Sequence, residues 1–96
     1  MSYLSFTIQL PVSIFREGAY FIAYTPALDI STAGKTYSEV KERFNEAVEI
    51  FFEETAKKGT LLEILQELGW TKVKKQWHPP VVISHESQEV RIAVPV

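Results

Sequence analysis

The chain has 96 residues, of which 46% are hydrophobic and 23% are charged, and its formal net charge is −2. This length and composition fit a single globular domain spanning residues 1–96. The absence of cysteine excludes disulfide frameworks, thiolate zinc sites and cysteine nucleophiles. The first residues lack the basic and apolar regions of a secretory signal, and no apolar run approaches the roughly 20 residues of a membrane span. We therefore expect a cytoplasmic protein.

Three strands are predicted in the first third of the chain. Residues 4–14 alternate between apolar and polar side chains, which is typical of a half-buried strand. Residues 16–18 form a turn into a second strand at residues 19–25, so these two strands make an antiparallel hairpin. A third, shorter strand is expected at residues 28–33, ended by Gly34.

A long helix follows the third strand. Thr36 and Glu39 have the spacing of a capping box, in which a hydroxyl and a carboxylate bind free backbone groups at the start of a helix. Apolar residues recur at helical spacing from there to about Lys58, and Gly59 is a suitable residue for the end of the helix.

The C-terminal part is predicted to add a short helix and strands. A second capping box at residues 60–63 indicates a helix that Gly69 ends. We expect residues 70–80 to be irregular, and residues 81–84 and 89–94 to form a final hairpin.

The order of elements is therefore β-β-β-α-α-β, with a C-terminal strand or hairpin. It predicts an α+β fold, a two-layer sandwich in which one long and one short helix pack a three-stranded antiparallel sheet. Residues 1–58 form the β-β-β-α core, and residues 59–96 add the short helix and the C-terminal strand segment.

Three stretches of the core resemble the HicB-like antitoxin family. Residues 20–30, YFIAYTPALDI, resemble its "YFVAYxPxLxL" strand motif. Residues 34–40 resemble its "GxTxxEA" helix start, with Val40 where the family has alanine, and residues 46–51 resemble its "EAxELFLE" continuation. The resemblance covers about residues 3–58.

The resemblance implies a partial RNase-H-like fold without nuclease activity. Such a protein neutralises a small, basic HicA-type toxin by covering its RNA-cleaving histidine, and acidic helix residues would steer the toxin toward it. Many members add a C-terminal DNA-binding module, but one short helix followed by strands is not a helix-turn-helix, so direct DNA binding is not expected here. The alternative function is an oligomeric ligand- or nucleic-acid-binding domain without a toxin partner.

No catalytic, cofactor or metal site is expected. Two-metal hydrolysis requires several converging carboxylates, and Asp29 is the only aspartate in the chain. Asp29 is interpreted as a turn residue that bonds its own backbone, with a contact at the end of the sheet as the alternative. His78 and His85 are the only histidines, and neither has the neighbours that a general base or a metal site requires.

Interface residues are expected among apolar side chains that the predicted elements cannot bury. The second strand is apolar on both faces, and helices can cover only one, so the C-terminal segment, a second subunit or a partner must cover the other. The two tryptophans either pack the tail or form a binding hot spot. The apolar segment at residues 90–96 favours strand addition and a homodimer. The expected interface residues are Tyr20, Ile22, Tyr24, Ile50, Trp70, Trp77, Val90, Ile92 and Val94.

Overall fold

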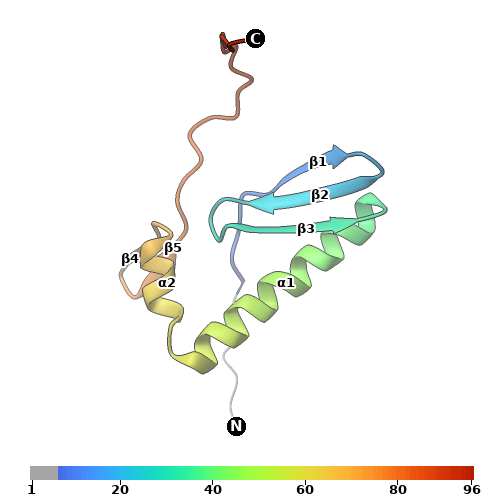
Figure 1. Cartoon of the computed structure of the whole chain (residues 1–96). Coiled ribbons are helices and arrows are strands. Elements are labelled where there is room, and N and C mark those ends of the chain that lie inside the picture. The colour runs from blue at the N-terminus through green and yellow to red at the C-terminus, as the bar shows by residue number, and fades with distance from the viewer. Residues whose placement is uncertain (1–6) are drawn as a thin grey trace.

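The computed structural model describes residues 7–96 as an α+β fold (Figure 1). It contains a three-stranded antiparallel sheet, one long and one short helix, and a two-stranded hairpin, which confirms the predicted fold class. The elements are β1 (Ser13–Glu17), β2 (Tyr20–Thr25), β3 (Ile30–Gly34), α1 (Tyr37–Lys58), α2 (Leu61–Glu67), β4 (Thr71–Val73) and β5 (Gln76–His78).

The first strand begins later than the alternation of side chains predicted. Residues 7–12 have no regular secondary structure, and residues 4–6 of the predicted strand lie outside the described residues. Pro11 has no N–H to donate to a neighbouring strand. The two-residue turn at Gly18 and Ala19 pairs Glu17 with Tyr20, and Gly18 has the positive φ of 61° that a type II′ turn requires. The turn therefore sets the register, and β2 begins at Tyr20, one residue later than we expected.

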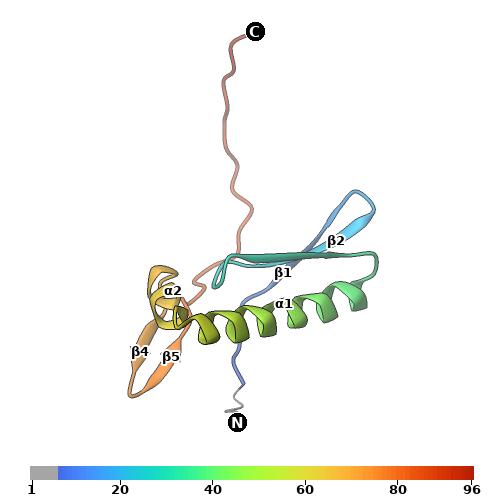
Figure 2. The same cartoon turned by 60° about the horizontal axis from the view of Figure 1, so that its bottom comes forward.

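The sheet has the order β1-β2-β3, and α1 packs across β2 and β3 to form the second layer (Figure 2). Ala23 of β2 packs there against Val40 and Phe44 of α1, and all three side chains are buried. Within residues 7–96, no helix is both long and apolar enough to cross a lipid bilayer.

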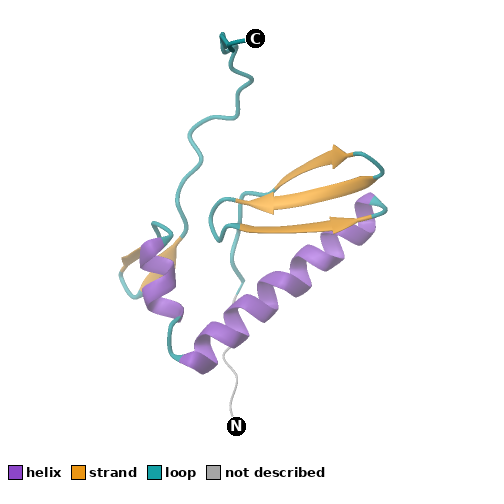
Figure 3. Ribbon diagram, viewed as in Figure 1, coloured by secondary structure: helices purple, strands orange, loops and turns teal. Residues whose placement is uncertain are grey.

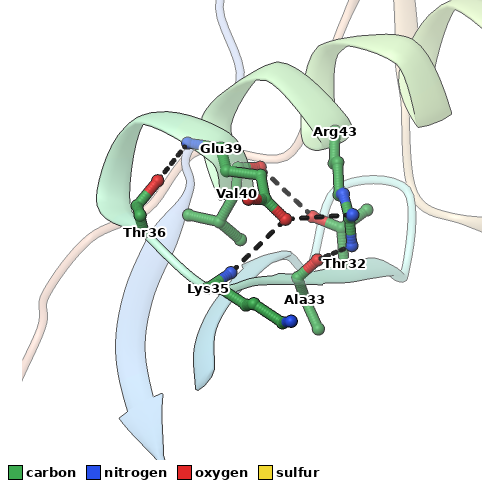
Figure 4. Close-up of polar contacts among 7 residues, drawn as sticks. All are labelled: Thr32, Ala33, Lys35, Thr36, Glu39, Val40 and Arg43. Carbon is green, nitrogen blue, oxygen red and sulfur yellow. Dashed lines mark hydrogen bonds and ion pairs between the residues drawn. The ribbon is translucent and has the colours of Figure 1, made fainter. Parts of the chain in front are cut away.

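A polar network joins the start of α1 to β3 (Figure 4). The Thr36 hydroxyl accepts a hydrogen bond from the Glu39 backbone N–H at 3.0 Å, as the capping box predicted. The Glu39 carboxylate accepts from the Lys35 backbone N–H at 3.5 Å and pairs with Arg43 at 2.9 Å. Arg43 also donates to the carbonyl of Ala33 at 3.0 Å. These contacts fix the angle at which α1 leaves the sheet.

Two Schellman motifs, rather than a second capping box, shape the connection through α2. Gly59 has a φ of 72°, and the Thr60 N–H donates to the Thr55 carbonyl at 3.0 Å. This commits Thr60 to the end of α1, and its side chain makes no cap on α2, so the second capping box was wrong. At the end of α2, Gly69 has a φ of 87°, and the Trp70 N–H donates to the Leu65 carbonyl at 2.9 Å.

The C-terminal hairpin lies earlier than predicted. Residues 71–78, expected to be irregular, form β4 and β5, whereas residues 79–96 have no regular secondary structure (Figure 3). The predicted hairpin at residues 81–84 and 89–94 is therefore wrong. An isolated pair of strands is at best marginally stable in water. The β4–β5 hairpin is supported, because its Trp77 packs against the cluster of Ala27, Leu28, Leu65 and Trp70.

The turn of this hairpin carries backbone strain that a substitution can relieve. Lys74 and Lys75 have φ values of 51° and 67°, the left-handed pair of a type I′ turn that Asn-Gly adopts most easily. We expect Lys74→Asn combined with Lys75→Gly to raise the free energy of unfolding by about 1 kcal/mol. Thermal unfolding followed by circular dichroism measures this gain.

The matched control replaces both residues by glutamine, which removes the same two charges but keeps both Cβ atoms. This control should not raise the stability, because the left-handed conformation stays unfavourable. An equal gain from both pairs of substitutions would instead attribute the effect to charge.

Candidate protein-interaction surfaces

The face of the sheet that points away from α1 carries four large side chains. Phe15 of β1 lies opposite Ile22 of β2, and Tyr20 and Tyr24 lie on either side of Ile22 along β2. Phe15 is 48% exposed and Tyr20 is 47% exposed. In the part of the chain that the structure describes, α1 lies under the sheet and α2 lies beyond its end, so no helix covers this face (Figure 2). We refer to these four residues as the open face.

Carboxylates lie at both ends of the open face. Glu17 pairs with Tyr20 across the β1–β2 ladder, and at the other end the Tyr24 hydroxyl donates to Asp29 Oδ1 at 3.1 Å. The hydrogen bond to Asp29, together with desolvation and the negative charge of the carboxylate, raises the pKa of Tyr24 above its ordinary value of 10.0. The phenol therefore stays protonated in neutral solution and keeps Asp29 in place.

Asp29 is a turn residue, as one of the two interpretations held. Its φ of 53° is in the left-handed region, which aspartate tolerates better than most residues. Its carboxylate bonds to Tyr24 rather than to its own backbone. The side chain is exposed, so a partner on the open face would meet a negative charge beside Tyr24.

A second apolar surface lies beneath β1, where α1 does not reach. This groove has a volume of ≈ 1350 Å³, and it lies between residues 7–14 on one side and α1 on the other. Lys41, Glu49, Glu53 and Lys57 of α1 also line it and give it charges of both signs. We refer to it as the flank groove. Its apolar lining includes Leu10, Val12, Ile14, Phe44, Val48 and Phe52.

A third hollow of ≈ 900 Å³ lies beside α2 and contains both tryptophans in its lining. Trp70 is only 4% exposed, and its Nε1–H donates to the Ala27 carbonyl at 2.7 Å. The ring of Phe52 packs edge-on against it, with 6.4 Å between the two ring centroids. Trp77 is half-buried on the same core cluster. Trp70 therefore belongs to the core and not to the surface on which we expected an interface residue.

The C-terminal tail, residues 79–96, is the most exposed apolar segment among residues 7–96. Val90, Ile92 and Val94 are 65%, 76% and 73% exposed. Ile50 on α1 is also 58% exposed, but it lies apart from the open face on the helix layer. The expected interface residues thus form no single patch.

The chain was compared with models of known protein families, with curated proteins and with solved structures. None of the three comparisons found a match. The resemblance to HicB-like antitoxins, which covers about residues 3–58, rests on its sequence motifs alone.

The two histidines do not assemble a reactive group. His78 is exposed on β5, and His85 is exposed in the tail. The Ser84 hydroxyl donates to Glu86 Oε2 at 2.8 Å and not to His85. Among residues 7–96, no three histidine, aspartate or glutamate side chains gather closely enough to hold a metal ion.

Phe15 is the member of the open face that sequence reasoning missed. The predicted first strand ended at residue 14, which left Phe15 beyond its end. The signal in the sequence was Gly18, because a glycine here favours a two-residue hairpin turn. Such a turn extends the first strand to Glu17 and pairs Phe15 with Ile22.

Proposed function

We propose that the protein is a non-catalytic, cytoplasmic, HicB-like antitoxin that neutralises a small, basic, RNA-cleaving toxin by protein–protein contact. The observation that carries this proposal is the open face, which presents Phe15, Tyr20, Ile22 and Tyr24 side by side. Contiguous exposed apolar surface of this kind marks protein-binding sites, and tyrosine is enriched among the residues that dominate binding energy.

Charge supports a basic partner. Glu17 and Asp29 lie at the two ends of the open face. The helix layer adds more negative charge, because residues 37–69 carry eight acidic and four basic side chains. Complementary charge raises association rates and disfavours acidic partners. The exposed glutamates of α1 are Glu42, Glu46, Glu49, Glu53 and Glu54.

Binding without catalysis is the function that the titratable groups favour. A nuclease of the RNase H type needs several carboxylates converging on two cations. Asp29 instead hydrogen-bonds to Tyr24, and the glutamates of α1 are spread along a solvent-facing helix surface. These groups suit the steering of a partner rather than phosphodiester hydrolysis.

The test uses the product of a short, basic reading frame beside the gene. We expect the purified chain to suppress RNA cleavage by this product and to bind it in calorimetry. Tyr20→Lys removes an aromatic ring from the open face and places a positive charge opposite a basic partner, and a hot-spot loss of about 2 kcal/mol weakens binding about 30-fold. The matched control is Val73→Lys on β4, where the replaced side chain is 52% exposed and lies off the open face.

Each outcome bears on the proposal. Suppression that Tyr20→Lys removes and Val73→Lys keeps supports it. RNA cleavage that continues in the presence of a saturating amount of the chain contradicts it. If the chain itself retains RNA in a salt-dependent way, the nucleic-acid-binding alternative is favoured, with Lys72, Lys74 and Lys75 of the β4–β5 hairpin as its contacts.

A further inference from the structure

The C-terminal tail gives the chain an unusually long shape. The molecule measures 59 × 31 × 24 Å, and its radius of gyration is 16.6 Å. A compact domain of this length would have a radius of gyration of about 12.5 Å. Figure 1 shows that the extension is the tail, which runs away from the body without pairing with any strand of residues 7–78. An exposed apolar segment of this length is typical of a site that contacts another molecule.

The tail has the side-chain pattern of a strand with one apolar face. Val90, Ile92 and Val94 alternate with Glu89 and Arg91, so in an extended chain the three apolar side chains point to one side. The segment is already non-helical and exposed, which leaves its backbone N–H and C=O groups available for a sheet edge.

Of the two sheet edges, β1 is the one open to a further strand. On the β3 edge, Arg43 of α1 donates to the Ala33 carbonyl at 3.0 Å, and α1 packs alongside. Strand β1 has β2 on one side and no strand on its other side within residues 7–96. A strand added to the sheet therefore meets the least obstruction at Ser13–Glu17.

The flank groove lies directly below this edge. A helix is about 10–12 Å wide, whereas three strands spaced about 4.8 Å apart make a wider layer, so α1 alone cannot cover the sheet. Because α1 sits under β2 and β3, the apolar residues Val12 and Ile14 on the β1 side face an opening of ≈ 1350 Å³. Val12 remains 40% exposed.

We propose that residues 90–94 of one copy of the chain add to β1 of a second copy as an antiparallel fourth strand. Val90, Ile92 and Val94 then lie over the flank groove of the second copy, where they meet Val12, Ile14 and the flank of α1. This inference does not depend on the antitoxin proposal, because it uses the β1 edge and the underside of the sheet rather than the four side chains of the open face, and Glu17 is the one residue that both proposals use.

Charge selects the register. An antiparallel pairing that opposes Glu17 with Arg91 joins opposite charges and also opposes Ile14 with Val94 on the groove side. In this register Pro95, which has no N–H to donate, falls opposite Ser13 at the first residue of β1. The pairing therefore ends at Ser13 and Pro95, where the proline can donate no further hydrogen bond to the ladder.

The direction of the tail favours a second copy over the chain's own β1. The tail leaves beside Pro80, which lies next to α2, and Figure 2 shows it running away on the side of the sheet opposite α1. The flank groove opens on the α1 side. Two copies related by a twofold axis can exchange tails reciprocally, which fills both grooves and closes the assembly.

Light scattering coupled to size exclusion tests the dimer in the full chain. We expect the wild-type chain to be a dimer and Ile92→Glu to raise its dissociation constant at least about tenfold, since it places a charge over the groove. The control Ile83→Glu makes the same change at a tail residue that is 90% exposed and lies outside the paired segment, and it should leave the dimer unchanged. Circular dichroism should show both variants folded, because the tail contributes nothing to the core. A monomeric wild-type chain, or a dimer that Ile92→Glu does not weaken, overturns the proposal.

Cysteine cross-linking tests the receiving strand, and the chain has no cysteine of its own. Glu17→Cys protein mixed with Arg91→Cys protein should give a disulfide-linked pair of different chains, whereas Glu17→Cys mixed with Ile83→Cys protein should not. Failure of the first mixture to cross-link in an intact dimer overturns β1 as the receiving edge. A disulfide within a single monomeric chain carrying both Glu17→Cys and Arg91→Cys would show that the tail folds back on its own sheet, and would overturn the exchange.

Discussion

Replacing Trp70 by alanine is expected to lower the free energy of unfolding by about 3–5 kcal/mol, because the substitution empties a large part of the core. Trp70 is only 4% exposed, and it joins the β2–β3 turn to α2 through Ala27, Leu28 and Leu65. Its Nε1–H is also the donor to the Ala27 carbonyl at 2.7 Å, so the substitution leaves a buried acceptor without this partner. Native domains have a total free energy of unfolding of about 5–15 kcal/mol, so a large fraction of the Trp70→Ala molecules should be unfolded.

Urea unfolding followed by far-ultraviolet circular dichroism measures the loss. Trp77→Ala is the matched control, because it removes the same type of side chain from a half-buried position at the edge of the same cluster. Trp70→Phe keeps an aromatic ring but removes the hydrogen bond to Ala27. It should lower the free energy of unfolding, but by less than Trp70→Ala does. If Trp70→Ala destabilises the chain no more than Trp77→Ala does, Trp70 is not the residue that holds α2 to the sheet.

Local signals in the sequence were sufficient for most of the fold. The hydroxyl of Thr36, the glycine at residue 59 and the helical stripe between them defined α1 with the bounds that the structure has. The strand predicted at residues 19–25 corresponds to β2 at Tyr20–Thr25, and the period of two separates its two faces. These features depend on side chains close together in the chain, for which spacing alone is informative.

Features that depend on distant contacts were missed. The β4–β5 hairpin has no alternation long enough to stand out, and two lysines occupy a turn that normally takes Asn-Gly. It forms where Trp77 can pack on the core, whereas the more strand-like residues 89–94 pair with no strand of residues 7–78.

The candidate surfaces show the same division. Tyr20, Ile22 and Tyr24 were placed together because they share one strand face. Trp70 was misjudged because its burial depends on the Ala27 carbonyl, 43 residues earlier in the chain. Phe15 joined the open face only through the register of β1 against β2. A surface that spans strands follows from pairing, which the composition of one strand does not specify.

Gly34→Ala is expected to cost about 1–3 kcal/mol or more, although it adds a single methyl group at the end of a strand. A Cβ at Gly34 would lie 2.7 Å from the Val40 backbone nitrogen and 2.9 Å from the Val40 Cα. These are backbone atoms of the first turn of α1, and no side-chain rotation can move them away. Val40 is itself fully buried against Ala23 and Phe44, so the helix must tilt and disturb the core.

The sign of the effect makes the test decisive. Gly34 does not have a positive φ, so without the close contact an alanine would stabilise the chain by restricting its unfolded state, by about 0.4–1 kcal/mol. Gly59→Ala is the contrasting variant, since Gly59 has open space around it and only its φ of 72° opposes a side chain. Combining Gly34→Ala with Val40→Ala should not restore stability, because the clash is with the Val40 backbone. A Gly34→Ala chain that unfolds at a higher urea concentration than wild type would show that α1 can move away from β3 without loss, and that the approach of helix to strand at Gly34 does not limit stability.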